Sequence, residues 1–419
     1  MKKFHKKVFY VMVLAAIFVA GCRSYEEKPI DWEKEAQAGK TNVIYITKLE
    51  DASNLALIGN RELNMMRLKA GGSAKIAKES GWWDDPELDF DLMRIVNPSS
   101  HPFLGGGSIA FTIPLSGALK LDKKAAEAYA EADAADIRSA ESDVAAEARK
   151  AAIRLCALRR RGKMLVDWRH DERAERARRN VKRLHEAGEV SASELAGLRR
   201  KMHTLRHEIM ENAKETTAAE IDFLRLLGLR PGCRIELKIA EENNVAKPSK
   251  DDDPLELVKH PKVVAALVRF GGTEHALNAE IRRQYPDLKL GPAYVNEEGL
   301  DRFGIVAGLS IPLWNRNRKG IAEAEAARNE ARLEAIDTWR KLVCDGAEAR
   351  ANLTELLAHP PVPSSEREHT DALADAGELT PMEYLAVRDE IMEFELADVE
   401  WRRDVALAVA ELERLKVNR

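Results

Sequence analysis

The sequence has few aromatic residues, few cysteines and no strong excess of either charge. Aromatic residues make up 6% of the 419 residues, and four residues are cysteines. The 66 basic and 70 acidic residues leave a formal charge of -4. A nucleic-acid binder needs a clustered basic face, so this balance argues against nucleic acid as a partner.

The sequence also lacks the motifs of common enzymes. It contains no nucleophile elbow, phosphate-binding loop or metalloprotease helix. His203 and His207 share a helical face at i and i+4, which is a spacing that can hold a metal. The basic residues around them favour two solvent-exposed histidines over a metal site. We therefore predict no enzymatic activity, no metal and no cofactor.

A long apolar run occurs only at the N-terminus. A basic segment precedes 12 apolar residues, Val8 to Val19, which are too few to span a bilayer as a helix. Residues 1–21 are therefore predicted to be a signal peptide. Cys22 follows Ala20 and Gly21, which resembles the bacterial lipoprotein lipobox; this implies cleavage before Cys22 and lipidation, including palmitate. An ordinary secretory signal with a chance cysteine is the alternative. Arg23, in place of aspartate, favours the outer membrane.

The rest of the chain contains one module twice. Residues 286–325 repeat the pattern of residues 86–131: a strand, a loop, a second strand that stops at Ile-Pro-Leu, and an Ala-rich helix. The distance in sequence between matching positions of the two copies decreases slowly along the chain. It is 200 residues from Pro86 to Pro286, 198 from Pro114 to Pro312 and 189 from Gly188 to Gly377. We predict a lipidated extension at 22–48, a first repeat at 49–230, a linker at 231–254 and a second repeat at 255–419.

Each repeat is expected to begin with a helix and continue with a strand hairpin, at 86–115 and at 286–313. In the first strand Leu88, Phe90 and Leu92 alternate with Glu87, Asp89 and Asp91. Strands of about 9 to 11 residues cross a bilayer when tilted. Four strands cannot close a barrel and open edges are not tolerated in lipid, so several chains would have to share one. A small soluble sheet is the alternative.

Long helical hairpins follow, at 116–228 and at 317–416. Residues 120–184 contain no proline, so one uninterrupted helix is predicted there, whereas residues 359–365 interrupt the matching helix of the second repeat. Small residues follow one face of the long helix in each repeat at coiled-coil spacing. They are Ala128, Ala132, Ala135, Ser139, Ser142 and Ala146 in the first repeat and Ala324, Ala327 and Ala331 in the second. Cys156 and Cys344 are predicted to be small residues of the core rather than partners in a disulfide bond.

Two Ala-Gly-Glu turns reverse these hairpins. Glycine suits a helix C-terminus, and Ser191 with Glu194 and Thr380 with Glu383 predict capping boxes for the returning helices. The turn residues are Ala187, Gly188, Glu189, Val190 and Ser191 in the first hairpin and Ala376, Gly377, Glu378, Leu379 and Thr380 in the second.

The sequence resembles the outer-membrane efflux channel family, the TolC-like exit ducts of bacterial tripartite pumps. The resemblance rests on PDLKLGPAY, GLSIPLWNRNRKGIAEAEA, the two turns and FLRLLGL, in this order. It implies a mixed α and β membrane protein, mainly α: a homotrimer with a twelve-stranded barrel, four strands per chain, continued by a periplasmic α-helical tunnel.

The resemblance also implies partners and sites. The partners would be outer-membrane lipids, a periplasmic adaptor that docks at the two turns, and an inner-membrane pump. Apart from the resemblance, the acidic side chains themselves suggest two hypotheses: Glu87, Asp89 and Asp91 line the barrel lumen and set a preference for cations, and Asp371, Asp375 and Glu378 form an acidic ring that narrows the closed end. The alternative function is a periplasmic structural coiled-coil lipoprotein without channel activity. The transported substrate stays open.

Overall fold

The computed structural model describes residues 25–37, 43–94, 96, 103–239, 253–297, 300–361 and 367–416. The chain divides into two units, residues 1–40 and 41–419. In the first unit the structure describes one short helix, α2 (Trp32–Gln37). Cys22 and the predicted signal peptide lie outside the described residues.

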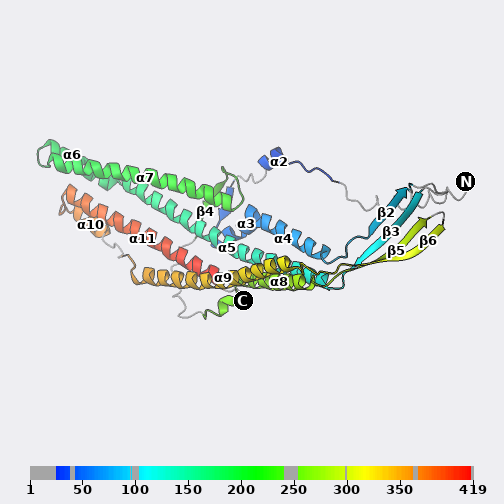
Figure 1. The fold of residues 1–419 in the computed structure, drawn as a ribbon. Coiled ribbons are helices and arrows are strands. Elements are labelled where there is room, and N and C mark those ends of the chain that lie inside the picture. Colours follow the sequence, from blue (N-terminus) through cyan, green and yellow to red (C-terminus); the bar gives the residue numbers. More distant parts are fainter. Residues whose placement is uncertain are drawn as a thin grey trace. The chain divides into compact units, whose positions relative to one another are not determined.

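The second unit carries an antiparallel four-stranded sheet at one end (Figure 1). Its strands are β2 (Glu87–Arg94), β3 (Phe103–Ile113), β5 (Leu288–Glu297) and β6 (Leu300–Leu309), in the order β2-β3-β5-β6. The two repeats therefore contribute one hairpin each, and β3 and β5 join them. The outer edges of β2 and β6 are not paired within this sheet.

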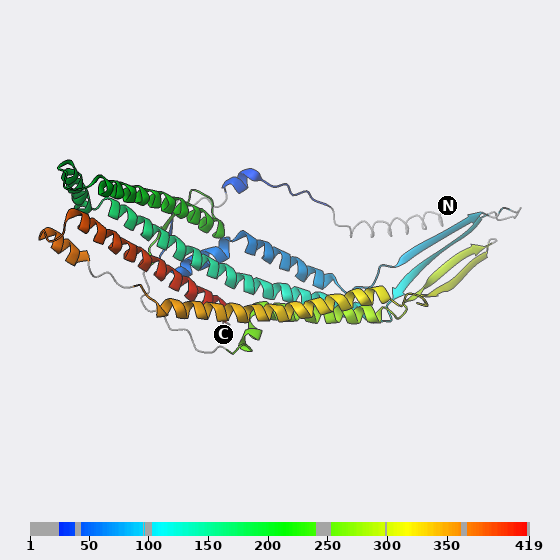
Figure 2. The ribbon, with the colours of Figure 1, turned by 60° about the vertical axis from the view of Figure 1, so that its left-hand side comes forward.

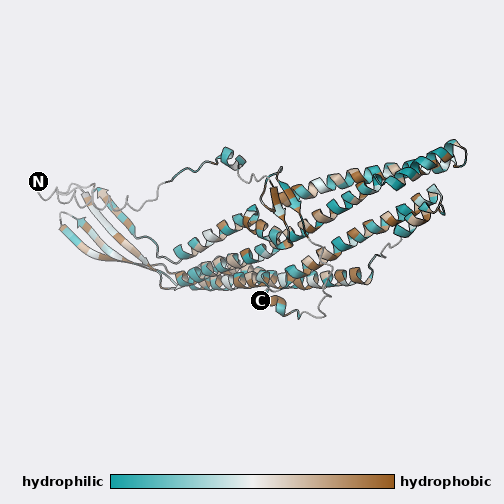
Figure 3. Cartoon of the chain, turned by 180° about the vertical axis from the view of Figure 1, so that it is seen from behind, coloured by the Kyte–Doolittle hydropathy of each residue, from teal (hydrophilic) through white to brown (hydrophobic). Residues whose placement is uncertain are grey.

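The register divides the side chains of the sheet into two faces. Glu87 lies opposite Ala110, and Thr112 lies opposite Lys289, so one face is mostly polar or small, although Val295 and Val306 also lie on it. Leu88 lies opposite Ile109 on the other face. That second face also holds Leu290, Phe303, Ile305 and Leu309, which are all exposed in the single chain. Figure 3 shows apolar residues recurring along the strands.

The helices of the first repeat run away from the sheet (Figures 1 and 2). They are α3 (Leu49–Gly59), α4 (Arg61–Glu79), α5 (Ala118–Arg169), α6 (Glu172–Glu186) and α7 (Ala192–Leu226). The prediction of one uninterrupted helix over 120–184 is wrong, because α5 ends at Arg169. Asp171 caps α6 by accepting a hydrogen bond from the Ala174 amide at 2.9 Å. A short carboxylate that bonds the backbone competes with a continuing helix.

The second repeat has η1 (Glu256–Lys259), α8 (Pro261–Arg282), α9 (Arg318–Ala358), α10 (Arg367–Asp375) and α11 (Pro381–Leu415). The helix is interrupted between α9 and α10, as the prolines predict. Both repeats are thus broken at a corresponding point before the hairpin turn. Among the helices of the described segments, none is both long and apolar enough to cross a membrane.

A second, two-stranded sheet lies in the middle of the helical part. The strand β1 (Val43–Ile46) pairs in parallel with β4 (Arg234–Leu237), which lies inside the predicted linker 231–254. Ile46 and Ile235 are buried there in a core with apolar residues of α3, α5 and α7; its buried members are Ile46, Ala52, Ala56, Ala148, Ala152, Leu155, Phe223, Leu224, Leu227, Cys233 and Ile235.

The small-residue seam of α5 is largely buried. Ala132, Ala135, Ser139 and Ala146 are buried, Ala128 and Ser142 are half-buried, and α5 packs along α8. In α9 only Ala331 of the three predicted alanines is buried. Cys156 is half-buried, but Cys344 is exposed, so its prediction as a core residue is wrong for this chain. Both are free thiols.

Candidate functional site

The two hairpin turns lie together at the end of the molecule away from the four-stranded sheet (Figure 1). In each turn a glycine adopts a left-handed conformation, with φ of 83° at Gly188 and 78° at Gly377. The amide of Glu189 donates to the Leu184 carbonyl at 2.9 Å, and that of Glu378 donates to the Leu373 carbonyl at 3.0 Å. These bonds satisfy the last carbonyls of α6 and α10, so both helices end in the same way.

Both returning helices begin with the predicted capping boxes. The Glu194 amide donates to the Ser191 hydroxyl, and the Ser191 amide donates to the Glu194 carboxylate at 2.8 Å. Thr380 and Glu383 repeat this exchange, again with 2.8 Å to the carboxylate. Hydrogen bonds from the serine lower the pKa of Glu194, and those from the threonine lower the pKa of Glu383. Both carboxylates therefore stay ionised at the helix N-termini.

An apolar cluster joins the two hairpins just behind the turns. It buries Ala174, Ala177 and Val181 of α6, Leu195 of α7, and Tyr384 and Leu385 of α11. Val190 and Leu379, from the turns themselves, pack against it and are half-buried. The other eight turn residues are exposed: Ala187, Gly188, Glu189, Ser191, Ala376, Gly377, Glu378 and Thr380. The turns thus present polar and small groups on an apolar base.

A buried charge network lies at the level where both repeats are broken. Arg388 of α11 is 1% exposed, and its guanidinium donates to the Asp171 carboxylate at 2.5 Å. The same guanidinium stacks over the Trp168 ring, 4.3 Å from its centroid. Asp371 of α10 accepts from the Tyr384 hydroxyl at 3.0 Å and lies 3.9 Å from Arg388. We call Trp168, Asp171, Asp371, Tyr384 and Arg388 the Arg388 network.

The network shifts the acidities of its members in opposite directions. Burial opposes ionisation of Asp171, but the Ala174 amide and the nearby Arg388 and Arg367 guanidinium groups lower the pKa of this carboxyl overall. Burial, together with the bond to Asp371, raises the pKa of Tyr384 to about 12. At neutral pH the network therefore contains charged Asp171 and Arg388 and a neutral tyrosine.

The sequence analysis did not identify Arg388 or Trp168. A signal for Arg388 was present, because it lies four residues after Tyr384 and three before Ile391, on the buried face of α11. An arginine among apolar positions of an amphipathic helix indicates a paired buried charge.

Two of the three carboxylates predicted to form the acidic ring are already paired with a cation of the same chain. Arg173 lies 2.9 Å from Asp375 and 3.9 Å from Asp371. Glu378, in the turn, makes no ion pair within the described part of the chain. The three residues therefore differ: two are partly neutralised and one is free to carry charge at the tip.

On the sheet, the predicted lumen residues share the polar face. Glu87 pairs with Lys289 of β5 at 2.6 Å, and Asp89 accepts a long bond of 3.5 Å from Ser108. Asp91 lies on the same face, opposite Gly106. Among the carboxylates of Glu87, Asp89 and Asp91 on β2, only that of Glu87 is paired with a lysine, Lys289, at one end of the strand.

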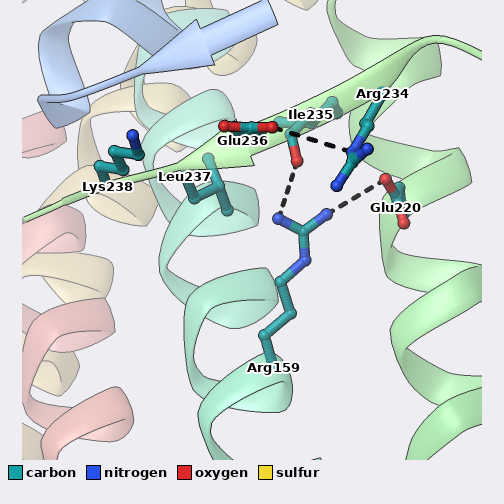
Figure 4. Close-up of a pocket in the computed structure, with 7 residues that line it drawn as sticks. All are labelled: Arg159, Glu220, Arg234, Ile235, Glu236, Leu237 and Lys238. Atoms are coloured by element: carbon teal, nitrogen blue, oxygen red, sulfur yellow. Dashed lines mark hydrogen bonds and ion pairs between the residues drawn. The ribbon is translucent and has the colours of Figure 1, made fainter. Parts of the chain in front are cut away.

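A surface pocket of about 430 Å³ lies beside β4 (Figure 4). Arg159 donates to the Ile235 carbonyl at 2.9 Å and to Glu220 at 3.1 Å. Arg234 and Glu236 form the opposite wall, 3.8 Å apart. The bond from Arg159 to the Ile235 carbonyl holds β4 on α5, whereas the pair of Arg234 and Glu236 lies within β4 itself. In the described segments, no group of three or more histidine, cysteine or acidic side chains is arranged to hold a metal.

Comparisons with known proteins establish the fold. No protein-family model and no curated protein matches the sequence. A membrane protein structure from Pseudomonas aeruginosa aligns with a TM-score of 0.72 at 16% identity, over 94% of this chain and 99% of that chain. The transmembrane channel protein CusC aligns with a TM-score of 0.72 at 13% identity, over 94% and 99%. The CmeC outer membrane channel from Campylobacter jejuni gives 0.70 at 15% identity, over 94% and 90%.

Proposed function

We propose, from a fold shared with outer-membrane channels, that this chain is the exit duct of a tripartite efflux system. It would conduct small molecules or ions passively from the periplasm to the exterior. The observation that carries the proposal is the sheet: one face is mostly apolar and exposed, the other is mostly polar or small, and long helices leave the sheet at one end. A membrane-spanning strand needs this alternation.

The open edges of the sheet require further copies of the chain. Backbone groups at the edges of β2 and β6 cannot remain unpaired in lipid. Three copies would supply twelve strands, an even number within the known range of barrels. Four exposed aromatic residues flank the helical end of the sheet, at the height of a membrane interface: Trp82, Trp83, Tyr285 and Trp314.

The hairpin tips are the proposed docking surface for a periplasmic adaptor. The turns 187–191 and 376–380, in which all residues except Val190 and Leu379 are exposed, lie farthest from the proposed membrane end, where a periplasmic protein would reach them. The buried base beneath them keeps both turns in fixed conformations, which lowers the entropic cost of binding. An inner-membrane pump would supply the energy.

The proposed conduit has a charged lumen and a narrow tip. Glu87, Asp89 and Asp91 would face the lumen and favour cations. At the tip, Asp371 and Asp375 would contribute less to an acidic ring than Glu378, because Arg173 pairs with both. Opening of the tip would require the Arg388 network to rearrange, since it connects α5, α10 and α11.

A lipid on Cys22 would add an anchor to the outer membrane. Mass spectrometry of the mature chain tests this proposal. We expect cleavage before Cys22, an added diacylglyceryl group and an amide-linked acyl chain, and expect Cys22→Ser to lack all three. A mature chain that begins elsewhere would contradict the lipid anchor and leave the channel proposal intact.

Purified protein in planar bilayers tests the channel function. We expect a detergent-extracted trimer that produces discrete conductance steps. The control is a chain in which Ile305→Asp and Phe303→Asp place charges on the apolar face; it should not insert. A monomer that is released from membranes without detergent and forms no pores would instead identify a structural periplasmic lipoprotein.

A further inference from the structure

A cationic segment connects the sheet to the helices in the second repeat. Residues 302–322 contain no acidic residue, and Arg316, Arg318 and Lys319 lie in their second half, between β6 and the first turn of α9. All three side chains are exposed. Within the described ranges, Arg316 and Arg318 make no ion pair, and Lys319 makes only a long one, of 3.6 Å, with Glu323. We call Arg316, Arg318 and Lys319 the junction cations.

Exposed apolar residues directly precede the junction cations. Ile311, Leu313 and Trp314 are 68%, 63% and 89% exposed. In the sequence, Ile311 and Leu313 continue the alternation that places Phe303 and Leu309 on the apolar face of the sheet. The chain therefore passes from an apolar surface to a cationic one within a few residues.

The backbone of this segment has an unusual conformation. Arg316 and Asn317 have φ of 44° and 51°, and no other residue except glycine has a positive φ in the part of the chain that the structure describes. Left-handed backbone is strained for an arginine, and such strain is concentrated at functional surfaces. The Asn317 side chain donates to the Glu280 carbonyl at 2.8 Å, which holds the segment on the end of α8. The junction cations therefore start from a fixed backbone.

Few carboxylates of the same chain can neutralise the junction cations. Asp122 of α5 and Glu280 of α8 are both paired with Arg283. Asp287 is exposed and lies directly before β5, whose first residue lies opposite the last residue of β6. One exposed carboxylate beside three cations leaves a net positive charge next to an apolar surface.

This composition fits the headgroup region of a membrane. Tryptophan is enriched at the boundary between acyl chains and water. Lysine and arginine near a membrane surface attract anionic headgroups, and arginine can donate two parallel hydrogen bonds to one phosphate. In the proposed channel the helical end of the sheet lies in the leaflet that faces the periplasm, so the junction cations are at the height of its headgroups.

We propose that the junction cations bind the phosphate groups of anionic phospholipids in the periplasmic leaflet, while Leu313 and Trp314 contact the upper part of the acyl chains. This inference rests on the proposed channel, because that function places the sheet in lipid. It adds a lipid class to the membrane contact: phosphatidylglycerol is enriched around this end of the sheet over phospholipids without net charge.

Retention of lipids by the purified chain tests the proposal. The mature chain in detergent is incubated with equal amounts of phosphatidylglycerol and phosphatidylethanolamine, and the lipids that stay bound after gel filtration are quantified by mass spectrometry. At about 0.1 M salt we expect phosphatidylglycerol to be retained at least about fivefold over phosphatidylethanolamine. In R316Q/R318Q/K319Q the ratio should fall to within about twofold of unity, because the three charges are removed.

Two further variants separate charge from apolar contact. R316K/R318K keeps the charges and should keep most of the enrichment. Trp314→Ser should lower the retained amount of both lipids and leave their ratio unchanged, since it removes only apolar contact. The matched control is R176Q/K182Q/R183Q, which removes three exposed cations from α6 at the other end of the molecule and should keep both the amount and the ratio.

An equal retention of the two lipids by the unmodified chain overturns the inference, as does a ratio that R316Q/R318Q/K319Q leaves unchanged. Enrichment that about 50 mM inorganic phosphate abolishes would identify a site for small anions instead of lipids. A lower trimer fraction with an unchanged lipid ratio would show that Asp84 and Asp85 of a neighbouring copy neutralise the junction cations. Lost enrichment in a chain that still conducts contradicts this inference alone, whereas a chain released from membranes without detergent contradicts the proposed channel and the inference with it.

Discussion

At the residue scale, the buried charge of Arg388 connects α11 to the break between α5 and α6. Its guanidinium is held by one short bond to Asp171 and by the Trp168 ring. A buried ion pair contributes little net stability compared with apolar packing, but its geometry is specific. The pair fixes α11 against the first residues of α6, at the point where α5 ends. We interpret the network as the determinant of the angle between the tips and the rest of the helices.

Removing Arg388 should be costly because it leaves Asp171 without its closest cation. We expect Arg388→Leu to lower the free energy of unfolding by about 3 kcal/mol. Lys341→Ala, which removes an exposed pair with Asp337, should change it by less than about 1 kcal/mol. Chemical denaturation followed by circular dichroism measures both. Similar small losses for the two variants would show that the network is not tightly coupled.

His260 gives a pH dependence at the same scale. It is 2% exposed, caps α8 by accepting from the Lys262 amide, and has a lowered pKa, first because of burial and then because of Lys262. The unfolded chain therefore binds a proton near pH 6.5 and the folded chain does not. Stability should fall as the pH decreases through about 6.5 and level off below the folded pKa.

His260→Asn keeps a capping side chain but does not titrate. We expect this variant to lack that part of the acid-dependent loss, measured as the shift of the urea midpoint between about pH 7.5 and about pH 5.5. Asp171, with its lowered pKa, should still reduce stability at lower pH, as its carboxyl becomes protonated. An unchanged acid profile in the variant would contradict the role of His260.

At the element scale, the tip turns are the part of the site that could be predicted from sequence. Glycine at a helix end and a serine or threonine three residues before glutamate are local signals. The break at His170 and Asp171 has no proline or glycine, and Asp171 pairs there with Arg388, more than two hundred residues away. The strand β4 was missed because four residues in a polar stretch pair in parallel with a distant partner.

The left-handed glycines should not accept a side chain. We expect Gly188→Ala and Gly377→Ala each to destabilise the protein by about 1 kcal/mol, because left-handed backbone is strained for other residues. Gly197→Ala is the matched control, since Gly197 lies inside α7 with open space at its Cβ position. That substitution should stabilise by about 0.5 to 1 kcal/mol. Unfolding midpoints that move in the same direction for all three variants would contradict this account.

At the scale of the whole molecule, the duplicated pattern and the order of elements could be predicted, and the comparisons confirm the fold. The arrangement of copies could not be derived from the repeats alone, because the unpaired edges of β2 and β6 call for further strands but do not say which helix surfaces would meet. Cys344 is exposed although Cys156 is half-buried, because α9 packs against fewer elements of its own chain than α5 does.

Ion selectivity tests which face of the sheet lines the lumen. We expect Asp89→Asn combined with Asp91→Asn to shift the reversal potential in a salt gradient toward zero, because two carboxylates per chain are removed from the proposed lumen. Asp301→Asn, on the opposite face, should leave it unchanged. Glu87→Gln should have a smaller effect than the double variant, since Lys289 already balances that charge. A shift with Asp301→Asn alone would indicate that the faces are assigned in reverse.

The core around β1 and β4 determines the order in which the chain can fold. Every buried member of that core lies within residues 46–235, in the first repeat and the short segments directly before and after it. A chain that emerges N-terminus first can therefore complete this core before α8 to α11 are available. The finished first half then offers α5 as a template along which α8 docks. We therefore expect the first half to form first and the second half to be added to it.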